Sequence, residues 1–337
     1  MAPKVSWNQL KHAYGAASDV PEVLSALDSP DRDVRLRAQE DLEARIAHQH
    51  AIYSASGPVV PLLLERLERQ GAPDRDGLAR ILSLLAWGHG EDTDVEAVTE
   101  ALDAATPRLA SLLNDPAPEV RRALAAVVSA VARRNALLVQ AVARRIRIET
   151  EASPLFALAM APAISRCREP SWLEACEALL AAPLPEHRLI GAAALASALA
   201  ERAPEAVVGP ILEALADPSP FEQAWVLAPW SSGKMVADLA NAASFLGPQR
   251  RFEVLPALAA AMERGGAAPE VAEAMLYMSF APDHAPKDAG QIAEGVVRDA
   301  LKRLVKCDAA WTARTVEVLG LAKLPGSRAA LRSWLGL

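Results

Sequence analysis

Three prolines mark a repeating unit, and this repeat constrains the fold more than any other feature of the chain. Pro30, Pro73 and Pro116 follow one another at intervals of 43 residues. Each opens a similar segment: SPDRDVRLRAQEDL, APDRDGLARILSLLA and DPAPEVRRALAAVVSAVA. The motif returns less regularly from Ala182 and from Asp217. Because self-similarity at such a period is the signature of stacked repeats, the chain is expected to consist of copies of one structural unit.

The chemistry of each unit predicts a turn followed by a helix. Asp31 is expected to cap a helix by accepting hydrogen bonds from its free amide groups. Pro118 and Pro185 suit a first helical turn, where no donor is lost. In the third unit, apolar residues then recur at the spacing of one buried helix face: Val120, Leu124, Val127, Val128 and Val131.

Composition favours helices throughout. Second apolar segments, at 58–70 and 97–114, lie between the units, so each unit is expected to be a helical hairpin of about 40 residues. Hydrophobic residues make up 52% of the chain but aromatics only 4%, so alanine and leucine, the best helix formers, must build the core. The sequence therefore predicts an all-α fold, a right-handed α-solenoid of stacked helical hairpins.

The run DPAPEVRRA at 115–123 resembles the core of a HEAT repeat. Arg35, Arg121 and Arg188 fall at the arginine position of that repeat, and in the HEAT family this arginine often pairs with an aspartate of a neighbouring repeat. The resemblance therefore implies a HEAT/armadillo-like superhelix and a structural role for these arginines. The N-terminal segment also resembles a family of uncharacterised bacterial HEAT-repeat proteins, which implies a bacterial, cytoplasmic protein.

The repeats are expected to form a single solenoid over residues 1–337. About seven to nine helical hairpins would fill this length, most regular over 20–230 and degenerate toward the C-terminus. Two stretches interrupt the pattern: 279–291, expected to be a longer inter-repeat loop, and 228–235, which contains Pro229 and Gly233.

Charge and cysteine content limit the classes of partner. The net charge of −7 argues against general affinity for nucleic acid or anionic membranes. The uncharged run at 152–165 is too short to span a bilayer, and residues 1–15 lack the apolar core of a signal peptide. Three cysteines without a C-x-x-C pair predict no disulfide framework or structural zinc site, and reduced thiols suit a cytoplasmic location.

A basic segment is the first candidate site. Between 116 and 148 the chain has seven arginines and one acid, Glu119. Four of them flank a predicted helix–turn–helix junction, and a fifth follows on the second helix. These are the candidate partner-binding residues: Arg133, Arg134, Arg144, Arg145 and Arg147. Such a patch suits an acidic protein or a phosphate backbone. The alternatives are a solvated helix face and ion pairs with the acidic run at 91–103.

A second candidate lies where the helical pattern is interrupted. Trp225 and Trp230 bracket the segment LAP, and Lys234 follows in the sequence SSGK. Large aromatic side chains anchor interfaces, which favours partner binding, whereas a tryptophan in an alanine-rich core is more often a packing residue.

Catalytic and metal motifs are absent from the sequence. It contains no G-x-S-x-G, P-loop or G-x-G-x-x-G pattern. His48 and His50, on a predicted helix, are two residues apart and point to different faces. A metal site from His89, Glu91 and Asp92 has weak spacing support, and a loop is preferred there. No catalytic, cofactor-binding or metal-ligating residue is therefore expected.

These observations favour a non-enzymatic protein–protein interaction scaffold or adaptor. Its partner would bind the concave or the basic surface, because stacked helical repeats form extended concave binding surfaces. The alternative is a HEAT-like DNA-binding enzyme of the alkylpurine glycosylase type, with nucleic acid at 121–147. A third hypothesis is a tetrapyrrole-lyase-like HEAT protein that acts on a chromophore-bearing partner, and only the fold supports it.

Overall fold

The structure is a computed structural model that describes residues 5–229, 231–280 and 295–337. These residues form 19 α-helices and one short antiparallel β-hairpin, with β1 (Lys11–His12) paired to β2 (Gly15–Ala16). The predicted all-α class is confirmed. The chain separates into two compact units, Met1–Trp172 and Leu173–Leu337, hereafter the N-terminal and C-terminal units. The expectation of one continuous solenoid stays a prediction.

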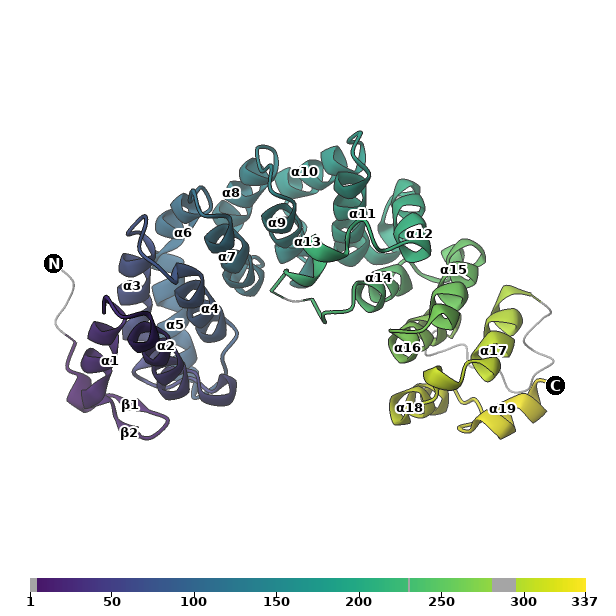
Figure 1. Cartoon of the computed structure of the whole chain (residues 1–337), viewed down its shortest axis with the longest axis horizontal. Helices are drawn as coiled ribbons and strands as arrows, with labels where there is room; N and C mark the ends of the chain where they lie inside the picture. Colours follow the sequence, from purple (N-terminus) through teal and green to yellow (C-terminus); the bar gives the residue numbers. More distant parts are fainter. Residues whose placement is uncertain (1–4, 230, 281–294) are drawn as a thin grey trace. The chain divides into compact units, whose positions relative to one another are not determined.

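The N-terminal unit stacks its helices in two rows (Figure 1). Helices α2, α4, α7 and α9 pack side by side in one row, while α3 packs on α5 and α6 packs on α8 in the other. The bounds are α1 (Val20–Ala26), α2 (Arg32–Ile46), α3 (Ser56–Leu67), α4 (Arg75–Ala86), α5 (Asp92–Ala104), α6 (Thr106–Leu112), α7 (Pro118–Val131), α8 (Ala136–Ile146), α9 (Ala152–Ile164) and α10 (Pro170–Leu180), which continues past Trp172.

The C-terminal unit has the same two-row arrangement. Helices α11, α14, α16 and α18 form one row, and α12, α15, α17 and α19 form the other. The bounds are α11 (Pro185–Leu199), α12 (Val208–Ala216), α13 (Glu222–Val226), α14 (Met235–Ser244), α15 (Arg251–Arg264), α16 (Ala268–Ser279), α17 (Val296–Lys306), α18 (Ala313–Leu321) and α19 (Arg328–Trp334).

The helix signals of the sequence are confirmed. The carboxylate of Asp31 accepts a 2.8 Å hydrogen bond from the amide of Asp33 at the start of α2. Pro118 and Pro185 are the first residues of α7 and α11. All five residues of the predicted apolar stripe of α7 are buried, none more than 2% exposed. Local turn chemistry and periodicity therefore decide where these helices begin and which face they bury.

One expected helix is absent from the described residues, and one expected loop falls mostly outside them. The predicted helix around His48 and His50 is wrong, because α2 ends at Ile46 and a short 3-10 turn with positive φ at Gln49 and His50 follows. The predicted inter-repeat loop at 279–291 lies almost wholly outside the described residues.

Gly191 lies at a close approach of two helices in the C-terminal unit. A Cβ atom at this position of α11 would lie 2.6 Å from both the carbonyl oxygen of Cys176 and the amide nitrogen of Leu180 in α10. The substitution Gly191→Ala is therefore expected to lower the free energy of unfolding by about 1–3 kcal/mol, although alanine is the better helix former. Urea denaturation followed by circular dichroism measures the change.

Gly320 in α18 provides the matched control, since nothing lies within 4 Å of a Cβ built there. Gly320→Ala is expected to be neutral or to stabilise the chain by up to about 1 kcal/mol. Equal stability of the two variants would show that α10 and α11 do not approach each other as closely as described.

Candidate partner-binding surface

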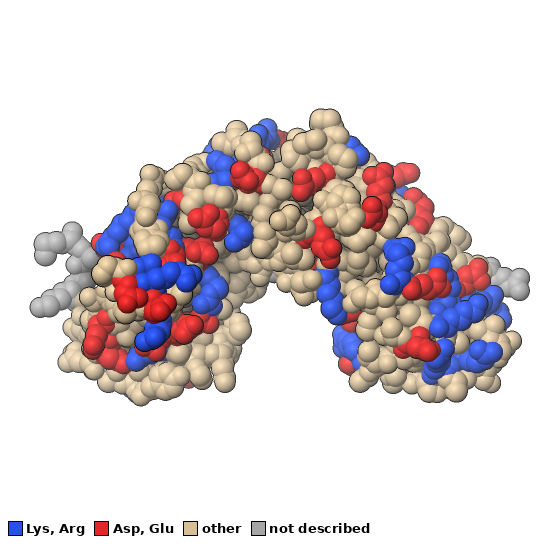
Figure 2. Space-filling view, in the orientation of Figure 1, with Lys and Arg blue, Asp and Glu red and all other residues tan. Residues whose placement is uncertain are grey.

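Positive and negative side chains are interspersed over the face of the N-terminal unit seen in Figure 2. Charged side chains that could bind a partner must therefore be distinguished from those that form ion pairs between helices.

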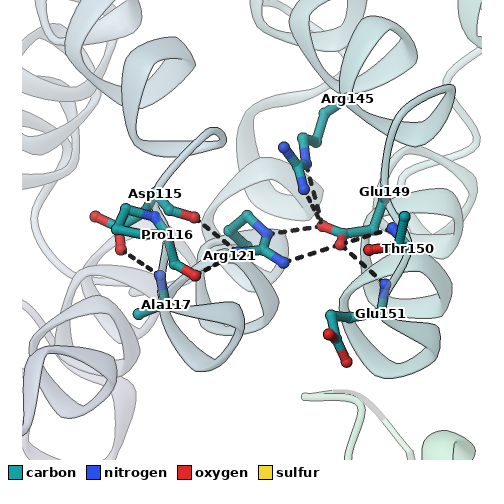
Figure 3. Close-up of polar contacts among 8 residues, drawn as sticks. All are labelled: Asp115, Pro116, Ala117, Arg121, Arg145, Glu149, Thr150 and Glu151. Carbon is teal, nitrogen blue, oxygen red and sulfur yellow. Dashed lines mark hydrogen bonds and ion pairs between the residues drawn. The ribbon is translucent and has the colours of Figure 1, made fainter.

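Arg121 in α7 joins its own turn to the next helical pair (Figure 3). Its Nη1 donates to the carbonyl oxygens of Asp115 (2.7 Å) and Pro116 (3.1 Å). Its Nε and Nη2 donate to the Glu149 carboxylate at 2.7 and 2.8 Å, and Arg145 donates to the same carboxylate. Because Arg121 and Glu149 are both buried, the predicted structural role of Arg121 is confirmed, with a glutamate in place of the expected aspartate.

Two further arginines in the N-terminal unit pair with a carboxylate of the next helical pair. Arg35 donates to the carbonyl oxygens of its own turn and, through Nε, to Asp74 at 2.9 Å. Arg75 forms a two-pronged contact with Asp115, with Nη1 to Oδ1 at 3.1 Å, and both side chains are no more than 3% exposed. We call these three pairs, which connect successive helical pairs, the arginine ladder.

Glu149 is charged despite its burial. Burial acts to raise the pKa of this carboxyl group, but the hydrogen bonds from Arg121, the amide of Glu151 and Arg145 outweigh it and hold the pKa below its ordinary value. The glutamate therefore remains an anion at neutral pH, and its negative charge offsets the positive charges of Arg121 and Arg145.

In the C-terminal unit the corresponding arginine, Arg188, has a weaker ion pair with the next helical pair. Arg188 Nη1 donates to the carbonyl oxygen of Pro183 at 2.9 Å, as Arg121 does to Pro116. Its ion pair with Glu213, however, is 4.0 Å long, and 68% of the Glu213 side chain is exposed. Arg188 thus closes its own turn and contributes little between helical pairs.

The five candidate arginines of the basic segment have different environments. Arg134 pairs with Asp103 of the acidic run at 3.3 Å, and Arg145 pairs with Glu149. Arg147 is exposed. Arg133 and Arg144 are exposed too, and neither makes an ion pair or side-chain hydrogen bond to any described residue. Pairing with the acidic run therefore accounts for one arginine of the five.

Helix α8 presents one face with both apolar and cationic groups. Leu137, Gln140, Arg144 and Arg147 follow helical spacing and define what we call the α8 face. Leu137 is 69% exposed. Gln140, Arg144 and Arg147 also line an open pocket of about 280 Å³, together with Ala143 and Ser171 at the start of α10. The sequence identified the arginines of this face but not the exposed leucine.

The second candidate cluster is partly a packing arrangement. Trp225 is 4% exposed, and its Nε1 donates to Asp238 Oδ2 in α14 at 2.9 Å. Lys234 forms a 2.7 Å ion pair with Glu270 in α16. Trp230 lies outside the described residues. Whether this cluster binds a partner stays a prediction.

Sequence reasoning did not single out Trp87 or Arg75. Trp87, directly after α4, is 50% exposed, and its Nε1 donates to the carbonyl oxygen of Ala126 and the hydroxyl of Ser129 in α7, both at 3.3 Å. The position of Trp87 directly before Gly88 is the sequence signal that could have indicated an exposed aromatic side chain. Arg75 follows its proline by two residues rather than five, so the repeat alignment did not mark it.

The part of the chain that the structure describes contains neither a metal-holding cluster nor a helix able to cross a membrane. No three His, Cys, Asp or Glu side chains there lie close enough together to hold a metal ion. His89 instead forms a β-bridge with Ala51. No helix in the described ranges combines the length and apolar character needed to cross a bilayer.

The fold and this surface define a helical-repeat protein in which ion pairs connect neighbouring helical pairs. No protein-family model matches the chain, and no curated protein sequence matches it. Three solved structures are similar at low identity. A chain from the complex of CpcE and CpcF of phycocyanin lyase from Nostoc is 15% identical with a TM-score of 0.42, and the alignment covers 96% of this chain and 98% of that one.

The other two similarities are of the same order. A Kap121p mutant is 11% identical with a TM-score of 0.42, and the alignment covers 93% of this chain but only 34% of Kap121p. An engineered protein is 16% identical with a TM-score of 0.32, and the alignment covers 94% of this chain and 97% of that one. At these identities and TM-scores, the similarities assign no function to the chain.

Proposed function

We propose that this protein is a non-enzymatic interaction scaffold that binds a partner protein through the α8 face and the turn before it. The observation that carries the proposal is the pair of exposed cations, Arg133 and Arg144, which have no carboxylate partner among the described residues. The exposed Leu137 lies on the same helix face as Arg144.

Exposed arginines beside an exposed apolar side chain are typical of interface centres, where arginine is enriched and lysine is depleted. The complementary partner surface would place carboxylates around an apolar residue that contacts Leu137. The open pocket between α8 and the start of α10 offers room for one such side chain.

The double variant Arg133→Glu/Arg144→Glu is expected to lose the partner. Both substitutions replace an attractive charge by a repulsive one at the proposed contact, which costs several kcal/mol when like charges meet across an interface. Tagged full-length protein and variant are used to capture partners from a lysate of the source organism, and the recovered proteins are quantified by mass spectrometry.

A variant with the same change in net charge serves as the control. Arg37 and Arg202 are exposed and make no ion pair to a described residue, so Arg37→Glu/Arg202→Glu is expected to keep the partner. Equal recovery with both double variants would rule out the α8 face. Retention of the unaltered protein on heparin at low salt, lost in Arg133→Glu/Arg144→Glu, would favour the nucleic-acid alternative instead.

A further inference from the structure

The last three helices carry a concentration of positive charge that the sequence reasoning did not use. Between residues 295 and 337 the chain has eight Lys or Arg and three Asp or Glu, a net charge of +5. The whole chain has a net charge of −7, so the remaining residues sum to −12. Figure 2 shows the corresponding cluster of Lys and Arg side chains at the end of the C-terminal unit.

Two helices bring these cations onto one surface. Arg298 Nη2, near the start of α17, donates to the carbonyl oxygen of Leu335 after α19 at 3.0 Å. Arg328 Nε, at the start of α19, donates to the carbonyl oxygen of Val305 near the end of α17 at 2.6 Å. The two helices therefore lie antiparallel and in contact, with both arginines at their junction.

Along each helix the cations follow a spacing of four residues. Arg298, Lys302 and Lys306 lie on one side of α17, and Arg328 and Arg332 lie on one side of α19. Successive members are about 6 Å apart along the helix axis. We call these five residues the basic surface.

Ion pairs neutralise only part of the basic surface. Lys302 pairs with Asp299 at 3.2 Å, and Arg328 pairs with Asp308. Arg298 donates to a carbonyl group, which leaves its charge uncompensated. The exposed side chains of Lys306 and Arg332 make no ion pair or hydrogen bond to any described residue. The charge of Lys306 does help to lower the pKa of Glu263 in α15, after the larger effect of Arg303.

We propose that the basic surface is a second docking site, and that its occupant is an acidic helical segment of a partner protein. Glutamates four residues apart on a helix are also about 6 Å apart, so two or three of them match the stripe on α17. This site belongs to the C-terminal unit and is independent of the α8 face.

The charge distribution favours an acidic protein segment over nucleic acid. Duplex DNA carries one negative charge per about 1.7 Å, so it would extend past a surface only about three helical turns long. The rest of the chain, with its net charge of −12, would repel those further phosphates. A short acidic helix carries its few charges only where the cations are.

The probe is a fluorescent alanine-based peptide of about 20 residues, long enough for appreciable helicity, with glutamate at every fourth position. The matched peptide has glutamine at these positions. Fluorescence anisotropy with the full-length protein is expected to show binding of the glutamate peptide only, weakened as ionic strength rises from about 0.01 M to about 0.15 M. The variant Lys306→Glu/Arg332→Glu is expected to weaken binding at least about tenfold.

Lys306 and Arg332 hold no described contact that folding requires, and circular dichroism verifies that the variant is folded. Arg37→Glu/Arg202→Glu, with the same change in net charge, is expected to bind as the unaltered protein does. Equal binding of the glutamine peptide, or equal loss in both double variants, would overturn the proposal. Tighter binding of a duplex DNA of similar length would overturn it in favour of nucleic acid.

Discussion

Replacing Asp115 by alanine is expected to lower the free energy of unfolding of the N-terminal unit by about 3–5 kcal/mol. The substitution leaves the guanidinium of Arg75 buried without a carboxylate, since both side chains are no more than 3% exposed. It also removes the acceptor of the Ala117 amide at the turn before α7. Hydrogen exchange of the α4 and α7 amides in the full chain measures the loss at the place where it arises.

Two comparisons test whether the loss of stability comes from the burial of an unpaired charge or from the loss of an ion pair alone. Glu68 and Arg108 also form a short ion pair, 2.7 Å, but their side chains are 40% and 35% exposed, so Glu68→Ala is expected to cost no more than about 1 kcal/mol. The double variant Arg75→Met/Asp115→Leu is expected to recover much of the stability, because no unpaired charge remains buried. Similar losses in Asp115→Ala and Glu68→Ala would contradict the burial argument.

Replacing Trp225 by alanine is expected to lower the free energy of unfolding of the C-terminal unit by about 3–5 kcal/mol. The side chain is 4% exposed, so its removal leaves a cavity beside α14. The Asp238 carboxylate also loses the hydrogen bond that Trp225 donates, although it still accepts hydrogen bonds from Ser231 and Ser232. Urea denaturation and the exchange of the α14 amides measure the effect.

Trp225→Phe refines this result, because it keeps most of the apolar volume and loses the hydrogen bond to Asp238. It is expected to cost about 1 kcal/mol. A partner-binding role would give the opposite pattern, with unchanged stability in Trp225→Ala and lower recovery of the partner. The two substitutions therefore decide between the packing and the interface hypotheses for this tryptophan.

The arginine ladder shows how far the repeat pattern predicts contacts. Arg35 and Arg121 occupy the same position of the repeat, and both bind their own turn and a carboxylate of the next helical pair. Arg75 reaches the same kind of partner from a different position, three residues earlier relative to its proline. A side chain as long as arginine can start from more than one place on a helix, so a motif finds only the copies that share its register.

At the candidate surfaces, the sequence pattern does not predict which side chains are exposed. Arg133 and Arg134 are adjacent in the sequence, yet only Arg134 meets an acidic side chain in the described residues. Trp225, which the sequence offered as an interface residue, is buried, whereas Trp87 is half exposed. Neighbours along a helix point in different directions, and the elements packed against each direction decide what remains accessible.

The sequence by itself determined the helices, the turns that begin them and the buried stripe of α7, because capping, proline placement and periodicity act over a few residues. It also determined that the helices would stack, since a hairpin cannot bury its apolar face alone. Only the tertiary structure decided which charges are neutralised and which stay exposed. That choice depends on side chains 28 to 40 positions apart, such as Arg121 with Glu149 and Arg75 with Asp115. The repeat motif located Arg121 but neither its glutamate partner nor the second pair.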